Sequence, residues 1–113
     1  MMAGLPVTLL RASLSWVARR LGRHTVDFVD EEPDTPAPRT VYVVGEDGHQ
    51  WFAAFGCPCG CGETIKLSLV PGDRPGWRIR RHWDGTASLT PSVWRQVGCQ
   101  SHFWLRKGRT DWC

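Results

Sequence analysis

The sequence predicts a small, mainly β domain of antiparallel strands that is held together by a zinc site and carries one N-terminal amphipathic helix. Three observations lead to this prediction. Apolar side chains recur at helical spacing only near the N-terminus, and later short alternating segments are separated by glycine and proline turns. Between two of these segments, three cysteines alternate with proline and glycine. The chain has 113 residues, which suits one small core reinforced by a metal.

The N-terminal segment, residues 1–24, is predicted to be the amphipathic helix. Its apolar positions recur every three or four residues and form one stripe, which consists of Val7, Leu10, Leu14, Val17 and Leu21. Arginines gather near its C-terminal end, where positive charge suits the helix dipole, and Gly22 is expected to end it. We expect the stripe to pack on the domain's own sheet. Docking on a partner and lying on a membrane surface are the alternatives.

Residues 25–113 are predicted to form the zinc-containing β domain, with five to seven short strands. Residues 30–39 are acidic and contain three prolines, so we expect an extended, mobile connection there. The segments with strand character are 25–29, 40–44, 50–55, 64–69, 77–83, 86–89, 103–105 and 109–112. Between the segments 86–89 and 103–105, a short helix is predicted over residues 90–96, with Thr90 as its cap and Pro91 at its first position.

The segment 55–63, with the sequence F-G-C-P-C-G-C-G-E, carries the metal prediction. Glycine and proline let such a loop turn several sulfurs toward one point, and thiolates are typical ligands of Zn²⁺. A closed structural site needs four ligands, and our predicted set is Cys57, Cys59, Cys61 and Cys99. Cys113 and His102 are alternatives for one position, and a disulfide or buried free thiols are the non-metal interpretation. If only three protein ligands were present, the zinc would have room for a hydrolytic water.

A serine and a histidine outside this loop form a candidate catalytic pair. Histidine is the usual base that activates serine, and His102 follows Ser92 across an expected turn. Ser92 is expected at the start of the short helix, whose free N–H groups would stabilise an oxyanion. On spacing alone, a helix-capping serine and a buried or metal-binding histidine are favoured instead. Lesser candidates for these roles are Ser88, Ser101 and His82, and the residues that would orient a histidine are Asp84, Asp111 and Glu63.

Tryptophan and arginine interleave in the C-terminal half, a pattern that binds single-stranded nucleic acid in some proteins. We favour a Trp-rich core face opposite a solvated arginine face. The net charge of +3 is too weak to argue for a nucleic-acid partner, and no apolar run is long enough to span a membrane. Arg11 interrupts the only segment with the character of a signal peptide, so we expect a cytoplasmic protein.

Four motifs together resemble a family of small bacterial proteins classed as a domain of unknown function. They are C-P-C-G-C-G at 57–62, L-T-P-S-V at 89–93, C-Q-S-H-F-W-L at 99–105 and the terminal W-C. The resemblance covers residues 40–113. Members of this family lie beside ubiquitin-like proteins and beside enzymes that resemble ubiquitin-activating and ubiquitin-conjugating enzymes, in antiphage defence loci.

The resemblance implies a zinc-containing serine peptidase, similar to a deubiquitinase, that exposes the C-terminus of a ubiquitin-like modifier or releases the modifier from its targets. Residue by residue, it implies that Ser92 is the nucleophile, that His102 is the general base and that the cysteines hold a structural Zn²⁺. The implied partners are the ubiquitin-like protein and its activating or conjugating enzymes. Two alternatives stay open, namely a non-catalytic zinc-binding adaptor in the same pathway and a zinc-dependent hydrolase with His102 as a ligand.

Overall fold

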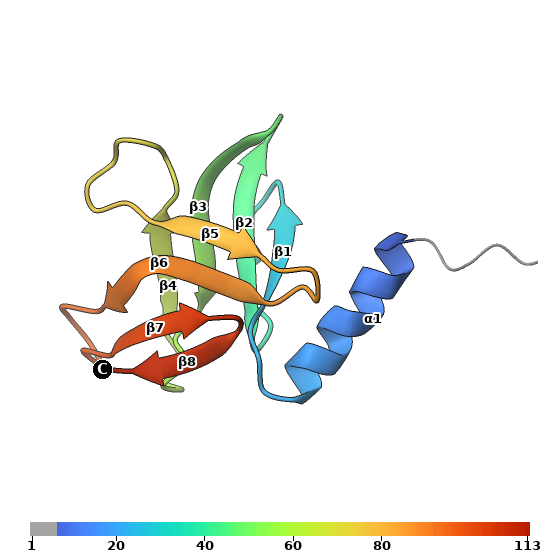
Figure 1. Cartoon of the computed structure of the whole chain (residues 1–113). Coiled ribbons are helices and arrows are strands. Elements are labelled where there is room, and N and C mark those ends of the chain that lie inside the picture. The colour runs from blue at the N-terminus through green and yellow to red at the C-terminus, as the bar shows by residue number, and fades with distance from the viewer. Residues whose placement is uncertain (1–6) are drawn as a thin grey trace, which may run out of the picture.

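Two four-stranded β-sheets pack against each other, and the strands of one sheet run across those of the other (Figure 1). The computed structural model describes the backbone of residues 7–113 and the side chains of residues 13–113. The first sheet has the order β1-β2-β3-β4, with bounds Thr25–Val29, Thr40–Glu46, His49–Gly56 and Thr64–Ser68. The second has the order β5-β6-β7-β8, with bounds Arg78–Arg81, Ala87–Trp94, His102–Arg106 and Arg109–Trp112. The mainly β prediction is confirmed, but the described chain has eight strands and not the expected five to seven.

Neighbouring strands pair antiparallel in both sheets, except that β1 and β2 run parallel. Parallel neighbours need a crossover connection, and the Pro-rich segment 30–39 provides it between these two strands. The predicted turn at Asp47 and Gly48 joins β2 to β3, and both residues have positive φ, at 52° and 78°. Such left-handed angles match the twist of the flanking strands. The tight turns therefore fix the order in which the strands pair.

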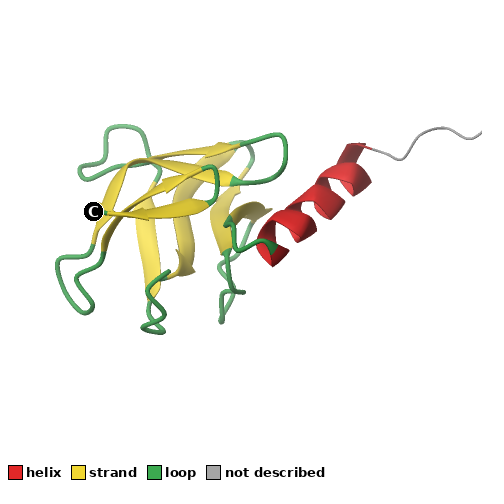
Figure 2. Cartoon of the chain, turned by 60° about the horizontal axis from the view of Figure 1, so that its bottom comes forward, coloured by secondary structure: helices red, strands yellow, loops and turns green. Residues whose placement is uncertain are grey.

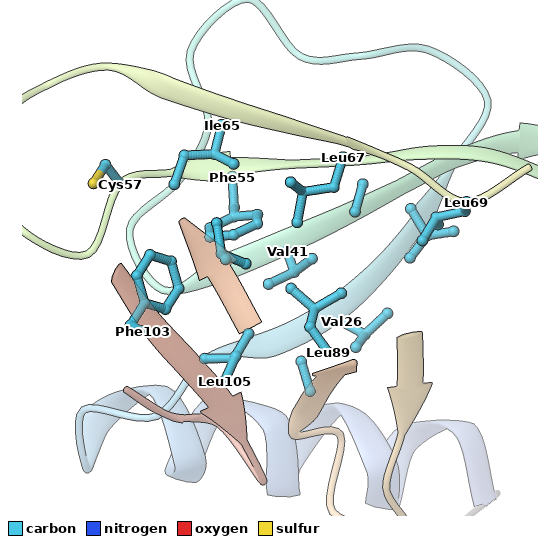
Figure 3. Packing of buried hydrophobic residues seen from close by; sticks show 14 residues of the cluster. Val26, Val41, Phe55, Cys57, Ile65, Leu67, Leu69, Leu89, Phe103 and Leu105 are labelled. Carbon is cyan, nitrogen blue, oxygen red and sulfur yellow. The ribbon is translucent and has the colours of Figure 1, made fainter. Parts of the chain in front are cut away.

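The core lies between the sheets and is built from alternate positions of the strands (Figure 3). In β4, for example, Ile65 and Leu67 are buried and alternate with polar residues, of which Thr64 and Lys66 are exposed. Phe55 of the first sheet meets Phe103 of the second edge to face, with ring centroids 6.4 Å apart. The core consists of Val26, Val41, Val43, Ala53, Phe55, Cys57, Ile65, Leu67, Leu69, Ala87, Leu89, Val93, Phe103 and Leu105.

The expected Trp-rich core is wrong. The exposed large side chains include five of the seven tryptophans, namely Trp16, Trp51, Trp83, Trp94 and Trp112. Trp77 packs against the core from its edge. The inward positions are taken by phenylalanine and aliphatic residues, which fill the roughly 10 Å space between two sheets, so the larger indoles lie at turns, strand ends and outward positions. Several tryptophans are thus free to contact a ligand.

The predicted helix is present as α1, Val7–Arg20, and Gly22 ends it with a φ of 83°. It projects to one side of the sandwich (Figure 2). The predicted apolar stripe is only partly right, because Val17 and Leu21 are exposed while Ser15 and Ala18 are buried. The helix meets the turn that contains Gly85. A Cβ at position 85 would lie 1.9 Å from the Ser15 hydroxyl oxygen, so a side chain fits there only if Ser15 moves. The stripe residues Val7 and Leu10 lie outside the described side chains.

The short helix predicted over residues 90–96 is wrong, because β6 continues to Trp94. Leu89 pairs with Leu105 and Val93 with Phe103, so three residues of β6 face only Trp104 on β7. This bulge accommodates Pro91, which a regular central strand would not tolerate. The Thr90–Pro91 peptide is cis. Ser92 therefore lies in a strand bulge, and the expected N–H groups of a helix N-terminus are not beside it.

Buried His24 predicts a loss of stability in mild acid. Its pKa is lowered, chiefly because burial disfavours the imidazolium; a backbone contact with Gly108 opposes this shift, and the charge of Arg39 adds to it. The unfolded chain therefore takes up the proton first as the pH falls below about 6.5, and the free energy of unfolding falls with it. We expect urea unfolding at pH 7 and pH 5 to show a smaller difference for His24→Phe than for the wild type. An equal difference would contradict this assignment.

Candidate active site and metal centre

Ser92 and His102 lie side by side on neighbouring strands of the second sheet. The Oγ atom of Ser92 is 3.1 Å from Nε2 of His102, which is hydrogen-bond distance. Val93 and Phe103, the next residue on each strand, pair with each other and point into the core. Since side chains alternate along a strand, Ser92 and His102 lie on the outer face of the sheet. The sequence-predicted pair is thus brought together, by strand register and a bulge.

Two tryptophans flank this pair. The Trp94 indole stacks on the His102 imidazole, with centroids 5.1 Å apart and planes 15° from parallel, because the two residues pair across β6 and β7. The indole Nε1–H of Trp77 donates a hydrogen bond of 3.3 Å to the backbone carbonyl of Ser92. Trp94 fixes the plane of the imidazole, and Trp77 fixes the backbone of the bulge. Sequence reasoning missed both roles, because they depend on the strand register.

The four predicted cysteines meet at one end of the sandwich, where Cys57 adjoins the core (Figure 3). Their sulfurs all lie within 4.8 Å of one another, with 3.3 Å from Cys57 to Cys59 and 3.6 Å from Cys57 to Cys99. Thiolates bound to Zn²⁺ at about 2.3 Å would be about 3.8 Å apart in a tetrahedron, so the cluster fits such an ion. All five cysteines, each within the described chain, are free, so the disulfide interpretation is not supported.

The cysteine cluster connects the two sheets. Cys57, Cys59 and Cys61 come from the loop between β3 and β4, and Cys99 comes from the connection between β6 and β7. That connection leads directly into His102, three residues after Cys99. A metal ion held by these four sulfurs would therefore join the sheets and restrain the segment that begins the histidine strand.

Arg95, Glu63 and Ser101 surround the cluster, and sequence reasoning missed all three in this role. The Arg95 guanidinium donates to the sulfurs of Cys61 and Cys99, at 3.9 Å and 3.8 Å, and also forms an ion pair with Glu63. This cation offsets the negative charge that four thiolates would bring. The only signal in the sequence was proximity, since Glu63 follows the cysteine loop closely and Arg95 precedes Cys99 by four residues.

The thiols differ in how easily they ionise. Burial raises the pKa of Cys57 to about 12, whereas a hydrogen bond with the Ser101 hydroxyl is the main cause that lowers the pKa of Cys99 to about 6. The Ser101 oxygen lies 3.2 Å from the Cys99 sulfur. Burial disfavours the thiolate of Cys57, and a cation at the centre of the cluster would stabilise it, because a bound metal stabilises the thiolate of every ligand.

The remaining candidates lie elsewhere. Cys113 is exposed and outside the cluster, and its backbone N–H donates to the His102 carbonyl. Each carboxylate considered for orienting a histidine has another partner: Asp84 accepts from Thr86, Asp111 pairs with Arg106, and Glu63 pairs with Arg95. Within the side chains of residues 13–113, no carboxylate hydrogen-bonds the His102 ring. The contact is therefore a dyad in this part of the chain.

A second serine–histidine contact occurs on the same sheet. Nε2 of His82 is 2.6 Å from the Ser88 hydroxyl, which also accepts a 2.8 Å hydrogen bond from the Lys107 backbone N–H. Burial is the main cause that lowers the pKa of His82. The described chain thus offers two Ser–His pairs, and of their histidines only His102 follows a cysteine of the cluster closely in sequence.

The described chain thus places a serine–histidine contact and four cysteines that could hold a metal ion on one small β-sandwich. The model of the family described as bacterial ubiquitination-like system serine protease (BubE) matches residues 28–113, and the chain belongs to this family. The match confirms the resemblance, and it begins within β1, after α1. Neither the curated proteins nor the solved structures yielded a match. In the described residues, no helix has the length and hydropathy needed to span a membrane.

Proposed function

We propose that this protein is a serine peptidase that cleaves after the C-terminal glycine of a bacterial ubiquitin-like modifier, either to expose that terminus or to release the modifier from targets. The observation that carries the proposal is the 3.1 Å contact between Ser92 Oγ and His102 Nε2 in a member of this serine protease family. The expected partners are the modifier and the enzymes that activate or conjugate it, in antiphage defence.

In the proposed reaction, Nε2 of His102 accepts the proton as Ser92 Oγ attacks the carbonyl carbon of the glycine. The tetrahedral intermediate collapses, the C–N bond breaks, and His102 passes its proton to the leaving amine. Water then gives a proton to His102 and attacks the ester carbonyl. The C–O bond to Ser92 breaks, His102 returns the proton to Ser92 Oγ, and the modifier leaves with a free carboxylate. In this proposal, the glycine-rich tail of the modifier lies against the exposed indole of Trp94 beside the pair.

The proposed Zn²⁺ is structural, with Cys57, Cys59, Cys61 and Cys99 as its ligands. Four thiolates complete a tetrahedron and leave no position for a reactive water. His102 contacts Ser92, not the sulfurs, which also argues against a zinc-dependent hydrolase with His102 as a ligand. When bound, the ion would supply a crosslink between the two sheets, while the chemistry stays with the serine and the histidine.

Trp94 is proposed as a positioning residue for His102. Trp94→Ala removes the stacked indole, and since such stacking contributes about 0.5–1.5 kcal/mol, we expect kcat to fall about two- to tenfold. Trp94→Phe should recover most of the loss, because a phenyl ring can still stack on the imidazole. Trp83→Ala is the matched control, as this indole is 76% exposed at a turn. An unchanged kcat in Trp94→Ala would contradict the role.

The test of the proposed function uses the ubiquitin-like protein encoded by a neighbouring gene, extended by several residues beyond its terminal glycine. The purified wild-type protein should shorten it to the glycine, as intact mass reports. Binding without turnover, unaffected by Ser92→Ala, would overturn the peptidase proposal in favour of a zinc-binding adaptor.

A further inference from the structure

The outer face of the second sheet continues from the Ser92–His102 pair into a basic pocket. His102, Trp104 and Arg106 are alternate residues of β7, so they share one face. The buried residues between them, Phe103 and Leu105, point into the core. The rise of about 3.3 Å per residue places Arg106 about 13 Å from His102 along the strand.

The pocket beyond Trp104 has a volume of about 680 Å³. It is lined by turns and strands that bring together four cationic side chains and one carboxylate, and these charged residues are Arg23, Arg106, Lys107, Arg109 and Asp111. Thr90, two residues from Ser92, and Trp104, two residues from His102, belong to its wall. The pocket is therefore adjacent to the candidate pair on the same face of the sheet.

Most of this positive charge is not neutralised within the protein. Asp111 lies 3.8 Å from Arg106, whose guanidinium also covers the Trp104 ring at 4.5 Å. Among the described side chains, Arg23, Lys107 and Arg109 form no ion pair. Three free cations around one concave surface attract an anionic ligand, and a wall that includes Trp104 suits an extended peptide better than an isolated ion.

We infer that this pocket binds an acidic segment of the protein substrate, in extended conformation, about three to five residues from the peptide bond that Ser92 attacks. The inference rests on the proposed function for the position of the scissile bond. The cations of Arg23, Lys107 and Arg109 pair with glutamate or aspartate side chains, and Trp104 contacts the peptide between the pocket and the Ser92–His102 pair. Substrate selection thus combines a glycine at the scissile bond with acidic residues at a set distance from it.

The test compares peptides that share one glycine-containing cleavage sequence and carry three Glu, three Gln or three Lys about four residues from the glycine, on either side. Binding is measured first, by fluorescence anisotropy on the Ser92→Ala variant, so that it does not depend on turnover. We expect the best Glu peptide to bind about tenfold or more tighter than its Gln counterpart, with the preference shrinking as salt rises. Cleavage by the wild type should follow the same order.

Charge variants test whether the arginines of the pocket cause the preference for the Glu peptide. Arg23→Glu with Arg109→Glu should remove the preference for the Glu peptide, and the milder Arg23→Gln with Arg109→Gln should reduce it if the first pair disturbs folding. Arg74→Glu, the same substitution at a single exposed arginine outside the pocket, should leave the preference intact. Equal binding of Glu and Gln peptides would overturn the inference, as would tight binding of a single-stranded oligonucleotide without binding of the Glu peptide. Absence of cleavage with the Glu preference intact would overturn the proposed function alone.

Discussion

Ser92→Ala is expected to lower the rate of modifier cleavage by roughly 10³-fold or more, because removal of a serine nucleophile leaves only binding and transition-state contacts. The fold should be unaffected. The Ser92 hydroxyl lies on the outer face of the sheet, where it contacts His102, so its loss leaves the neighbouring core residue Val93 in place. The measurement is single-turnover cleavage of the extended modifier, with thermal unfolding of the same sample as a check on folding.

Ser88→Ala is the matched control for this prediction. Ser88 lies on the same strand, is half-buried like Ser92, and contacts its own histidine, His82, at 2.6 Å. We expect cleavage to change less than about threefold, since the Ser88 hydroxyl already accepts a hydrogen bond from the Lys107 backbone and serves the turn there. If Ser88→Ala stops cleavage and Ser92→Ala does not, the nucleophile is Ser88, which with His82 also lines the basic pocket.

Removal of the metal is expected to have the second large effect, with stability and activity lost together. The bound ion would tie the loop between β3 and β4 to the connection that leads into His102, and ligand binding to the folded state alone adds to stability. We expect a strong chelator to lower Tm by about 10 °C or more, which corresponds to about 2 kcal/mol or more for a domain of this size. Metal content is measured in parallel by elemental analysis, with about one Zn²⁺ per chain expected.

Cysteine variants distinguish the proposed metal ligands from the cysteine that lies outside the cluster. Cys99→Ser should reproduce the effect of chelation, because it removes the only cysteine of the cluster contributed by the second sheet. Cys113→Ser should retain the metal and the Tm, since Cys113 lies outside the cluster. Loss of turnover on chelation with Tm unchanged would contradict a structural zinc and support a zinc-dependent hydrolase.

The parts of the fold that depend on local chemistry could be predicted from the sequence. Alternation in β4, the turn at Asp47 and Gly48 and the end of α1 at Gly22 each follow from a few neighbouring residues. The cysteine cluster could also be predicted from the sequence, because three closely spaced cysteines among glycines are typical of a metal-binding loop. Choosing Cys99 over Cys113 as the fourth member of the cluster rested on its position before a strand, and the structure places Cys99 in the cluster.

The region around Ser92 could not be predicted, because its structure depends on pairing. Thr90 and Pro91 carry a local signal for the start of a helix, but pairing with β5 and β7 holds this segment as a strand, and a bulge accommodates the proline. The stacking of Trp94 on His102 follows from the same register. The exposed tryptophans were also missed, since composition says nothing about which positions face the core.

The most direct test of the central claim is to identify the residue that becomes covalently modified. The protein is treated with a fluorophosphonate, whose phosphorus is attacked by an activated serine hydroxyl with loss of fluoride, and is then digested with trypsin. Cleavage after Arg81 and Arg95 places Ser88 and Ser92 in one peptide, so fragmentation spectra must assign the adduct. We expect one adduct per chain, on Ser92, and no adduct in His102→Ala. An adduct on Ser88, or turnover of the modifier by a protein whose Ser92 never reacts, would contradict it.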